Sequence, residues 1–247
     1  MYGVNSNAIA TQITLVTEYL PPYQIVGEDN HNVTGFATDV VLETFKRSNI
    51  EYSIASYPWV RSYNLTLKNP NTCLFSIVRI PIRENKFAWV GQITKENNAV
   101  IWGLKSNNHT QHIKQLSDIK NYITAVNKDG VAHLGMIENG FVAGKHLYVL
   151  GYTKSLINLL VTRPEIDFIV ADDISISYRA KLAGININLL QRVLEIKSIP
   201  LNFYLACNKQ SNKTMLHTLQ DKLSEIHRDG TYIKILARWK NKMPHLQ

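Results

Sequence analysis

Two arginines follow one of the most apolar segments of the chain, and their position suggests an anion-binding site. The segment TCLFSIV, residues 72–78, has the length and composition of a buried strand, and Arg79 and Arg83 come directly after it in RIPIRE. A planar guanidinium can hold a carboxylate through two parallel hydrogen bonds. The alternative is that both are solvated surface charges. Arg83 is the better candidate for a ligand carboxylate.

A pair of carboxylates ends another strand-like segment, FIVADD, and supplies charge of the opposite sign. Asp172 and Asp173 stand just before the helical segment ISISY. Aspartate at this place commonly caps the following helix. If one of the two caps the helix, the other is free to accept hydrogen bonds from an ammonium group, and we expect Asp172 to have this second role.

Two loops after other strands contain further candidates. Lys128, Asp129, Gly130 and Val131 follow the strand-like YITAV and begin a helix, whose free backbone N–H groups favour an anion. Asp129 as a plain helix cap explains the same pattern equally well. Near the first strand, Glu18, Tyr19 and Tyr23 of EYLPPYQI could line a pocket. Trp59 of PWVR could be either a ligand wall or part of the core.

The composition excludes several classes of protein. The chain has 247 residues, of which 45% are hydrophobic and 19% charged, as in ordinary globular domains. The formal net charge is +8, but the basic residues are dispersed, so we expect a solvated basic surface and no nucleic-acid partner. No segment approaches the ~18 consecutive apolar residues of a membrane span.

Motifs for metal, cofactor or nucleophilic chemistry are missing from the sequence. The eight histidines form no HxH or HExxH pattern, and the chain has no GxSxG, GxxxxGK[ST] or GxGxxG. Cys73 and Cys207 lie in apolar strand-like segments, where small buried residues are expected, and a disulfide between them stays open for an exported protein. The sequence therefore predicts neither a metal nor a cofactor.

Strand-like and helical segments alternate along the chain, which predicts an α/β fold with mostly parallel sheets. The expected strands are residues 12–17, 52–57, 72–78, 122–127, 147–152, 167–173 and 200–209. The expected helices are residues 35–49, 59–69, 112–121, 130–141, 155–163, 175–184, 214–230 and 231–241. The pattern restarts after residues 87–105, so two lobes are expected, with a ligand in the crevice at the carboxyl ends of the strands.

Several segments from about residue 12 to 242 resemble the bacterial extracellular solute-binding proteins of family 3, the group that binds polar amino acids. The most specific one is the terminal Asp-Gly-Thr-x-x-x-Ile-x-x-x-Trp element. Two departures are Ile80, where threonine is usual, and residues 163–165, where a tight glycine turn often stands. The segments that carry the resemblance are TEYLPPYQI, VTGFATDVV, RIPIRENKFAWVG, EIDFIVADD and HRDGTYIKILARW.

The resemblance implies a two-lobed periplasmic-binding-protein-like fold of type II, with two α/β lobes joined by two hinge strands. The first lobe would comprise residues 1–92 and 197–247 and the second residues 95–194, with hinges near 91–95 and 195–200. Arg83 would hold the α-carboxylate of the ligand and Asp172 its α-amine. Residues 128–131 would complete the carboxylate site through their backbone, and Trp59 and Leu20 would lie near its apolar wall.

The resemblance also implies a function without catalysis. The expected protein is a monomeric periplasmic component of an ABC importer, which passes a small carboxylate, most simply an amino acid, to a permease. One alternative is a dehydratase or lyase on the same scaffold, similar to cyclohexadienyl dehydratase, for which Glu18 is the candidate acid. The other is an extracytoplasmic sensor domain, although the end of the chain at RWKNKMPHLQ favours a free-standing binder.

Overall fold

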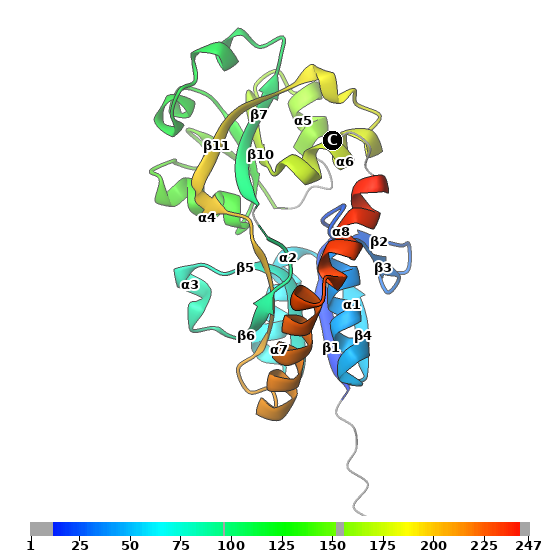
Figure 1. Ribbon diagram of the computed structural model, residues 1–247. Coiled ribbons are helices and arrows are strands. Elements are labelled where there is room, and N and C mark those ends of the chain that lie inside the picture. Colours follow the sequence, from blue (N-terminus) through cyan, green and yellow to red (C-terminus); the bar gives the residue numbers. More distant parts are fainter. Residues whose placement is uncertain (1–11, 96, 152–155, 243–247) are drawn as a thin grey trace, which may run out of the picture.

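The computed structural model describes residues 12–95, 97–151 and 156–242. It has two lobes, each built around a five-stranded sheet with helices packed on it (Figure 1). The expected strand 147–152 and helix 155–163 run into residues 152–155, and the first lobe was expected to include residues 1–11 and 243–247. These positions lie outside the described residues. The α/β class and the two lobes agree with the sequence prediction.

The first lobe contains the sheet with strand order β4-β1-β5-β12-β6. Its strands are β1 (Ile13–Thr17), β4 (Tyr52–Ser56), β5 (Thr72–Val78), β6 (Phe87–Gln92) and β12 (Phe203–Asn208). Its helices are α1 (Phe36–Ser48), α2 (Trp59–Lys68), α7 (Lys213–Arg228) and α8 (Thr231–Lys242). Smaller elements of this lobe are β2 (Ile25–Val26), β3 (Val33–Thr34) and the single-turn helix α3 (Pro81–Glu84).

The second lobe contains the sheet with strand order β11-β7-β10-β8-β9. Its strands are β7 (Asn98–Leu104), β8 (Thr124–Asn127), β9 (Leu147–Leu150), β10 (Phe168–Ala171) and β11 (Leu190–Pro200). Its helices are α4 (Val131–Glu138), α5 (Leu156–Thr162) and α6 (Asp173–Leu182), with 3-10 helices η1 (Asn108–His112), η2 (Leu116–Asn121) and η3 (Ile187–Leu189).

Both sheets are mixed, whereas the sequence pattern predicted mostly parallel ones. The strands β4, β1 and β5 are parallel, but β12 runs antiparallel to both β5 and β6. In the second lobe β7 runs antiparallel to both β10 and β11. Parallel neighbours need a crossover, usually a helix. The strands β7 and β12 are instead reached through the linkers between the lobes. The order of strands and helices along the sequence does not show this connection, so it could not predict that these strands are antiparallel.

The two linkers lie side by side. The chain crosses between the sheets after β6 and again after β11, and Ile93 N–H donates to the Phe203 carbonyl over 2.8 Å while Leu201 N–H donates to that of Asn97 over 2.6 Å. Because β11 continues to Pro200, the second crossing is at residues 201–202, later than the expected 195–200. The first crossing overlaps the expected residues 91–95, and that these segments act as hinges stays a prediction.

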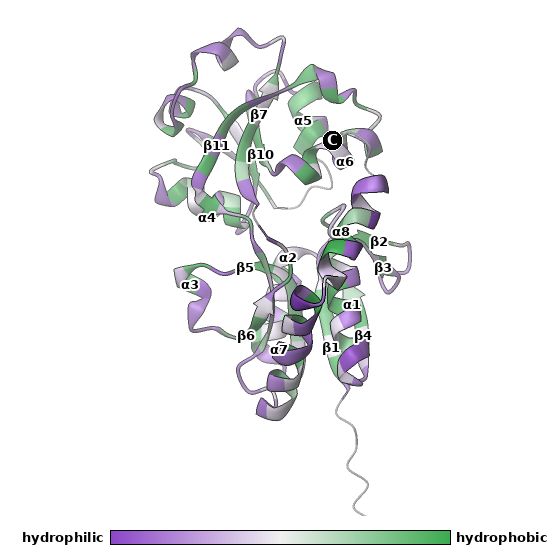
Figure 2. Cartoon of the chain, in the orientation of Figure 1, coloured by the Kyte–Doolittle hydropathy of each residue, from purple (hydrophilic) through white to green (hydrophobic). Residues whose placement is uncertain are grey.

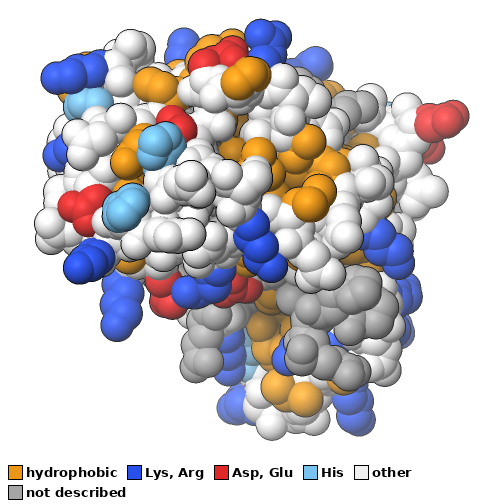
Figure 3. Space-filling model, turned by 90° about the horizontal axis from the view of Figure 1, so that it is seen from above, with side chains coloured by type: hydrophobic (Ala, Val, Ile, Leu, Met, Phe, Trp, Pro, Cys, Tyr) orange, Lys and Arg blue, Asp and Glu red, His pale blue; other side chains and the backbone are white. Residues whose placement is uncertain are grey.

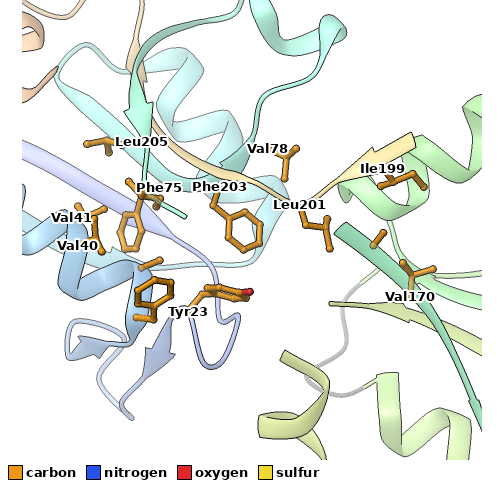
Figure 4. Close-up of a cluster of buried hydrophobic side chains, with 14 of the residues drawn as sticks. Tyr23, Val40, Val41, Phe75, Val78, Val170, Ile199, Leu201, Phe203 and Leu205 are labelled. Carbon is orange, nitrogen blue, oxygen red and sulfur yellow. The ribbon is translucent and has the colours of Figure 1, made fainter. Parts of the chain in front are cut away.

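An apolar core continues from one lobe into the other along these linkers. Figure 4 shows Phe203 and Leu201 leading from the first-lobe core around Tyr23 and Phe75 toward Ile199 and the second lobe. Apolar positions on the strands fill the inside of each lobe, and the helices direct polar faces outward (Figure 2). The lobes are therefore joined by packing as well as by chain.

The two cysteines form a disulfide within the first lobe. Cys73 on β5 and Cys207 on β12 are opposite each other in antiparallel register, and both are fully buried. Of the two possibilities that the sequence left open, the bonded pair is the one found. The bond links the early part of the first lobe to the segment that returns after the second crossing.

Glycine 35 fixes the loop that follows β1. The first N–H groups of α1 donate to the carbonyls of Pro22 and Tyr23. Gly35 has φ 130°, and a Cβ atom there would lie 2.3 Å from the Tyr23 carbonyl oxygen. Only glycine accommodates this backbone and this contact. The start of α1 therefore holds Tyr23 at the boundary between the lobes.

Candidate ligand-binding site

A cavity of about 130 Å³ lies between the lobes, at the ends of β1, β5, β8 and β10. Its walls are mainly apolar, with a few charged groups among them. The lining residues include, from the first lobe and its linker, Glu18, Leu20, Trp59, Ser76, Val78, Arg83, Leu201 and Phe203, and from the second, Val126–Lys128, Gly130–Ala132, Leu156, Val170–Asp172, Ser175 and Arg179. A small apolar pocket with few convergent polar groups is the usual form of a ligand site.

The short helix α3 places Arg83 in this cavity. Proline 81 begins the helix, and Arg83 is only 3% exposed. Its guanidinium donates to the carbonyls of Val78, over 3.2 Å, and Asp129, over 3.3 Å. Burial lowers the pKa of Arg83, opposed by the neighbouring Tyr63 and Glu18. The two hydrogen-bond partners of this buried guanidinium are neutral carbonyls, so its positive charge is available to an anion.

Trp59 closes one side of the site and contacts both lobes. The Arg83 guanidinium carbon lies 4.9 Å from the centre of the Trp59 ring, so the cation stacks on the indole. The indole N–H donates to the Asp129 carbonyl over 3.0 Å. Asp129 has a left-handed backbone with φ 58°, which turns this carbonyl toward the first lobe. Trp59 lines the cavity and also packs against apolar side chains of the first lobe, so its role as a ligand wall stays a prediction.

Asp172 combines a helix cap with a contact between the lobes. Its Oδ1 accepts from the Ser175 N–H over 2.8 Å, which caps α6, and from the Tyr23 hydroxyl over 2.9 Å. Asn97 in the first linker donates to the same hydroxyl oxygen over 2.7 Å. Because Tyr23 accepts that bond, its own proton is directed at Asp172. Burial and Asp172 raise the pKa of Tyr23 well above its usual value, so the phenol keeps this proton.

Glu18, at the end of β1, is a carboxyl group poised between its two protonation states. Burial raises its pKa to about 7, against the lowering effect of the Arg179 and Arg83 guanidiniums. Arg179 projects from α6 and donates to the Pro21 carbonyl over 3.4 Å. Near neutral pH, Glu18 can therefore either donate a hydrogen bond or carry a negative charge.

Most of the residues that the sequence singled out converge here, and three do not. Lys128, Gly130 and Val131 line the cavity together with Arg83, Asp172, Glu18 and Trp59, while Asp129 takes part through its backbone carbonyl. Arg79, Tyr19 and Tyr23 are not among the lining residues.

Arg79 lies on the surface, where residues of α3, β6 and β12 hold its side chain. It forms an ion pair with Glu84 and stacks over Trp89 and Tyr204, with its guanidinium carbon 5.2 and 6.0 Å from the two ring centres. Glu84 and the stacking rings compete with any ligand for this guanidinium, so we leave Arg79 out of the site.

Several cavity residues were missed in the sequence, and Arg179 and Ser76 are two of them. Arg179 lies seven residues after Asp172 and four residues after Ser175, so the helical period puts all three on one face of the helix. This spacing could have revealed Arg179 as a cavity residue. Ser76 lies in the middle of β5 but has a left-handed backbone with φ 63°, which residues other than glycine rarely adopt. The pairing with β12 skips Ser76, and its hydroxyl accepts from the Gln24 amide. Nothing in the sequence marks this irregularity.

Residues 13–242 match the bacterial extracellular solute-binding proteins, family 3. The match covers most of the chain, and the chain belongs to this family. The resemblance seen in the sequence is thereby confirmed. No curated protein matches the chain.

Solved structures with the same architecture include sensor and transport proteins. A histidine kinase sensor domain with similarity to periplasmic binding proteins superposes with a TM-score of 0.79 at 16% identity, covering 93% of this chain and 96% of that one. ArtJ of Geobacillus stearothermophilus, which binds arginine, lysine and histidine, gives 0.75 at 17%, covering 95% and 97%. A Streptococcus pneumoniae ABC uptake transporter binding protein with bound histidine gives 0.75 at 18%, covering 92% of both chains. At these identities the likeness establishes the fold.

The face of the molecule seen in Figure 3 agrees with the expectation of dispersed basic residues. On the face seen in Figure 3, lysine and arginine side chains are spread around the rim among polar and apolar ones. Within the described part of the chain, no helix is long and apolar enough to cross a membrane. No group of three or more potential metal ligands occurs among the same residues.

Proposed function

We propose that this chain is a solute-binding protein that captures a small carboxylate in the cavity between its lobes and does not transform it. The observation that carries the proposal is Arg83, a buried guanidinium with no carboxylate of the described chain in ion-pair distance, which stacks on Trp59 at the cavity wall. Membership in a family of solute-binding proteins supports it. The binding of amino acids by similar structures makes amino acids the first class to test.

The test is a calorimetric titration with a panel of amino acids and small carboxylates, followed by mass spectrometry of the recovered ligand. At least one carboxylate should bind with a 1:1 stoichiometry and be recovered unchanged after long incubation. A chemically altered product would refute the binding role, and a panel with no ligand would refute the carboxylate site.

We further propose that the protein works in the periplasm as a monomer and delivers its ligand to an ABC transporter permease. The family supports an extracytoplasmic solute-binding role. The same architecture in a histidine kinase sensor domain supports the alternative of a sensor. A genomic neighbourhood with permease and ATPase genes would favour transport, and one with a kinase would favour sensing.

Glu18 supports a second candidate, a dehydratase or lyase on the same scaffold. A general acid needs a carboxyl group whose pKa lies near the working pH, and burial raises the pKa of Glu18 to about 7. Incubation with prephenate or arogenate tests this candidate. If product forms and a Glu18→Gln variant does not form it, the enzyme replaces the binder as the proposed function.

Ligand binding is expected to draw the lobes together about the linkers at residues 93–97 and 201–202. The reason is that charged groups on both lobes line one cavity, so a bound ligand is held best when the walls are close. Small-angle scattering should give a smaller radius of gyration with ligand than without. An unchanged radius, with binding proven by calorimetry, would mean that the cleft does not close on its ligand.

Replacing Asp172 by asparagine should weaken the contact between the two lobes more than the binding of the ligand carboxylate to Arg83. The amide oxygen can still accept from Tyr23 and Ser175, but these bonds lose their charge-assisted strength. We expect affinity to fall by roughly 10- to 100-fold, as for a charged hydrogen-bonding partner worth ~1.5–3 kcal/mol. Scattering should show less compaction at saturating ligand. Unchanged affinity and unchanged compaction would show that Asp172 contributes neither to ligand binding nor to closure of the lobes.

A further inference from the structure

We infer that the site prefers small dicarboxylates without an ammonium group, with one carboxylate held by Arg83 and the other by Arg179. This inference rests on the proposed function and narrows it. It differs from the expectation of an amino-acid zwitterion, in which Asp172 receives the ligand ammonium. Three features of the cavity carry it.

The first feature is that the protein itself supplies hydrogen-bond donors to Asp172. Its Oδ1 already accepts two hydrogen bonds, from the Tyr23 hydroxyl and the Ser175 N–H. Asn97 orients the Tyr23 proton toward it. The carboxylate also caps α6, whose positive end favours the negative charge. An ammonium ligand would have to compete for Oδ1 or reach the other oxygen alone, so the gain from such a contact is reduced.

The second feature is that two guanidiniums from opposite lobes share the cavity. Arg83 comes from the first lobe and Arg179 from the second, and both bond to backbone carbonyls. In the described part of the chain, neither has a carboxylate within the 4.0 Å of an ion pair. Two guanidiniums can bind two carboxylates of one ligand, and a ligand held in this way also bridges the lobes.

The third feature is that Glu18 lines the same cavity as these two cations. Arg179 and Arg83 both act on it electrostatically, and Lys128 and Asp172 are the other charged groups that line the cavity. Because the pKa of Glu18 is about 7, the group takes up a proton readily when an anion arrives. In its protonated form it donates a hydrogen bond to a ligand oxygen instead of repelling it.

The charge of the ligand fixes the sign of the proton exchange. An anion beside Glu18 raises the pKa of Glu18 further, so binding takes up a proton near pH 7 and affinity falls as the pH rises above 7. A cationic ligand group beside Glu18 would lower that pKa, so binding would release a proton and affinity would rise with pH. The direction of proton exchange therefore distinguishes the two ligand classes.

The experiment compares ligands that differ by an ammonium group. Calorimetry on the whole chain uses succinate against aspartate and glutarate against glutamate, at pH 7 in two buffers of different ionisation enthalpy. We expect each dicarboxylate to bind at least tenfold more tightly than its amino counterpart and to take up a proton. Glu18→Gln should abolish the proton uptake while binding persists.

A matched pair of tyrosine variants tests the role of Asp172. Tyr23→Phe keeps the buried ring beside Phe203 but removes the hydroxyl that donates to Asp172. The ratio of dicarboxylate affinity to amino-acid affinity should therefore be smaller in this variant than in the wild type. Tyr19→Phe removes a hydroxyl from the same loop outside the cavity and should change nothing. If Tyr23→Phe fails to fold, the wild-type ligand comparison decides alone.

The outcomes separate this inference from the proposed function. Equal or tighter binding of aspartate or glutamate, or release of a proton, would overturn the dicarboxylate preference and leave a carboxylate-binding protein. Binding of other small carboxylates but of neither dicarboxylate would do the same. If no carboxylate binds at all, the proposed function itself fails.

Discussion

Replacing Arg83 by alanine is expected to abolish measurable ligand binding while the protein stays folded. The Arg83 side chain is buried in the cavity wall. It donates hydrogen bonds to the backbone carbonyls of Val78 and Asp129, whose positions are fixed by their own strand and loop, so we expect the fold to survive the substitution. Loss of one partner of a buried charge-assisted pair costs ~2–5 kcal/mol, which is about 30-fold or more in affinity. Calorimetry on the variant, with its melting temperature as a check on folding, measures this loss.

Arg79 offers a matched control four residues earlier. Arg79→Ala removes the same side chain from the same connection, but breaks only a surface ion pair with Glu84 and contacts with Trp89 and Tyr204. Its affinity should stay within about twofold of the wild type, because exposed ion pairs contribute little. Equal losses for both variants would mean that Arg83 acts through the shape of this segment and not through its charge.

Removing the Cys73–Cys207 disulfide is expected to give the largest loss of stability. The bond joins positions 134 residues apart, and long closed loops restrict the unfolded chain most. A Cys73→Ala/Cys207→Ala double variant should lose about 2–5 kcal/mol of unfolding free energy. For a chain of this size, the melting temperature should fall by roughly 5–15 °C.

Wild-type protein unfolded with and without reductant serves as the control, because it keeps both sulfur atoms and so separates the cross-link from the packing. Thiol counting on the denatured, unreduced chain should find no free thiol. Ligand affinity of the folded double variant should be unchanged, since both cysteines lie outside the cavity lining. A variant with wild-type stability would show that the bond contributes nothing to the fold.

The sequence was sufficient for most helices, for seven of the strands and for the position of Arg83, but it did not predict β6, β7 or β11. Strand-like segments followed by helices predicted the lobes, and a strand end marked Arg83 and Asp172 as residues near a crevice. These features depend on local periodicity, which one sequence displays directly. Arg79 lies outside the cavity because its guanidinium contacts Glu84, Trp89 and Tyr204. The contacts with the two rings depend on how the strands are arranged in three dimensions, which the sequence does not show.

Contacts between distant segments could not be predicted. The hydrogen bond from Tyr23 to Asp172 joins positions 149 residues apart and depends on how the lobes meet. The carbonyl of Asp129 serves Trp59 and Arg83 because of its left-handed backbone, whereas the sequence pointed to its side chain and to backbone N–H groups. The antiparallel strands β7 and β12 follow from the linkers and not from any local pattern.

We propose that the cavity binds a small carboxylate through the charge of Arg83. The most direct measurement is a thermal-shift comparison of small carboxylates with their neutral amides, on the wild type and on Arg83→Ala. A ligand that binds the native state raises its melting temperature. We expect at least one carboxylate to stabilise the wild type, its amide to have no effect, and Arg83→Ala to lose the stabilisation. Equal stabilisation by acid and amide, or an undiminished shift in Arg83→Ala, would contradict this proposal.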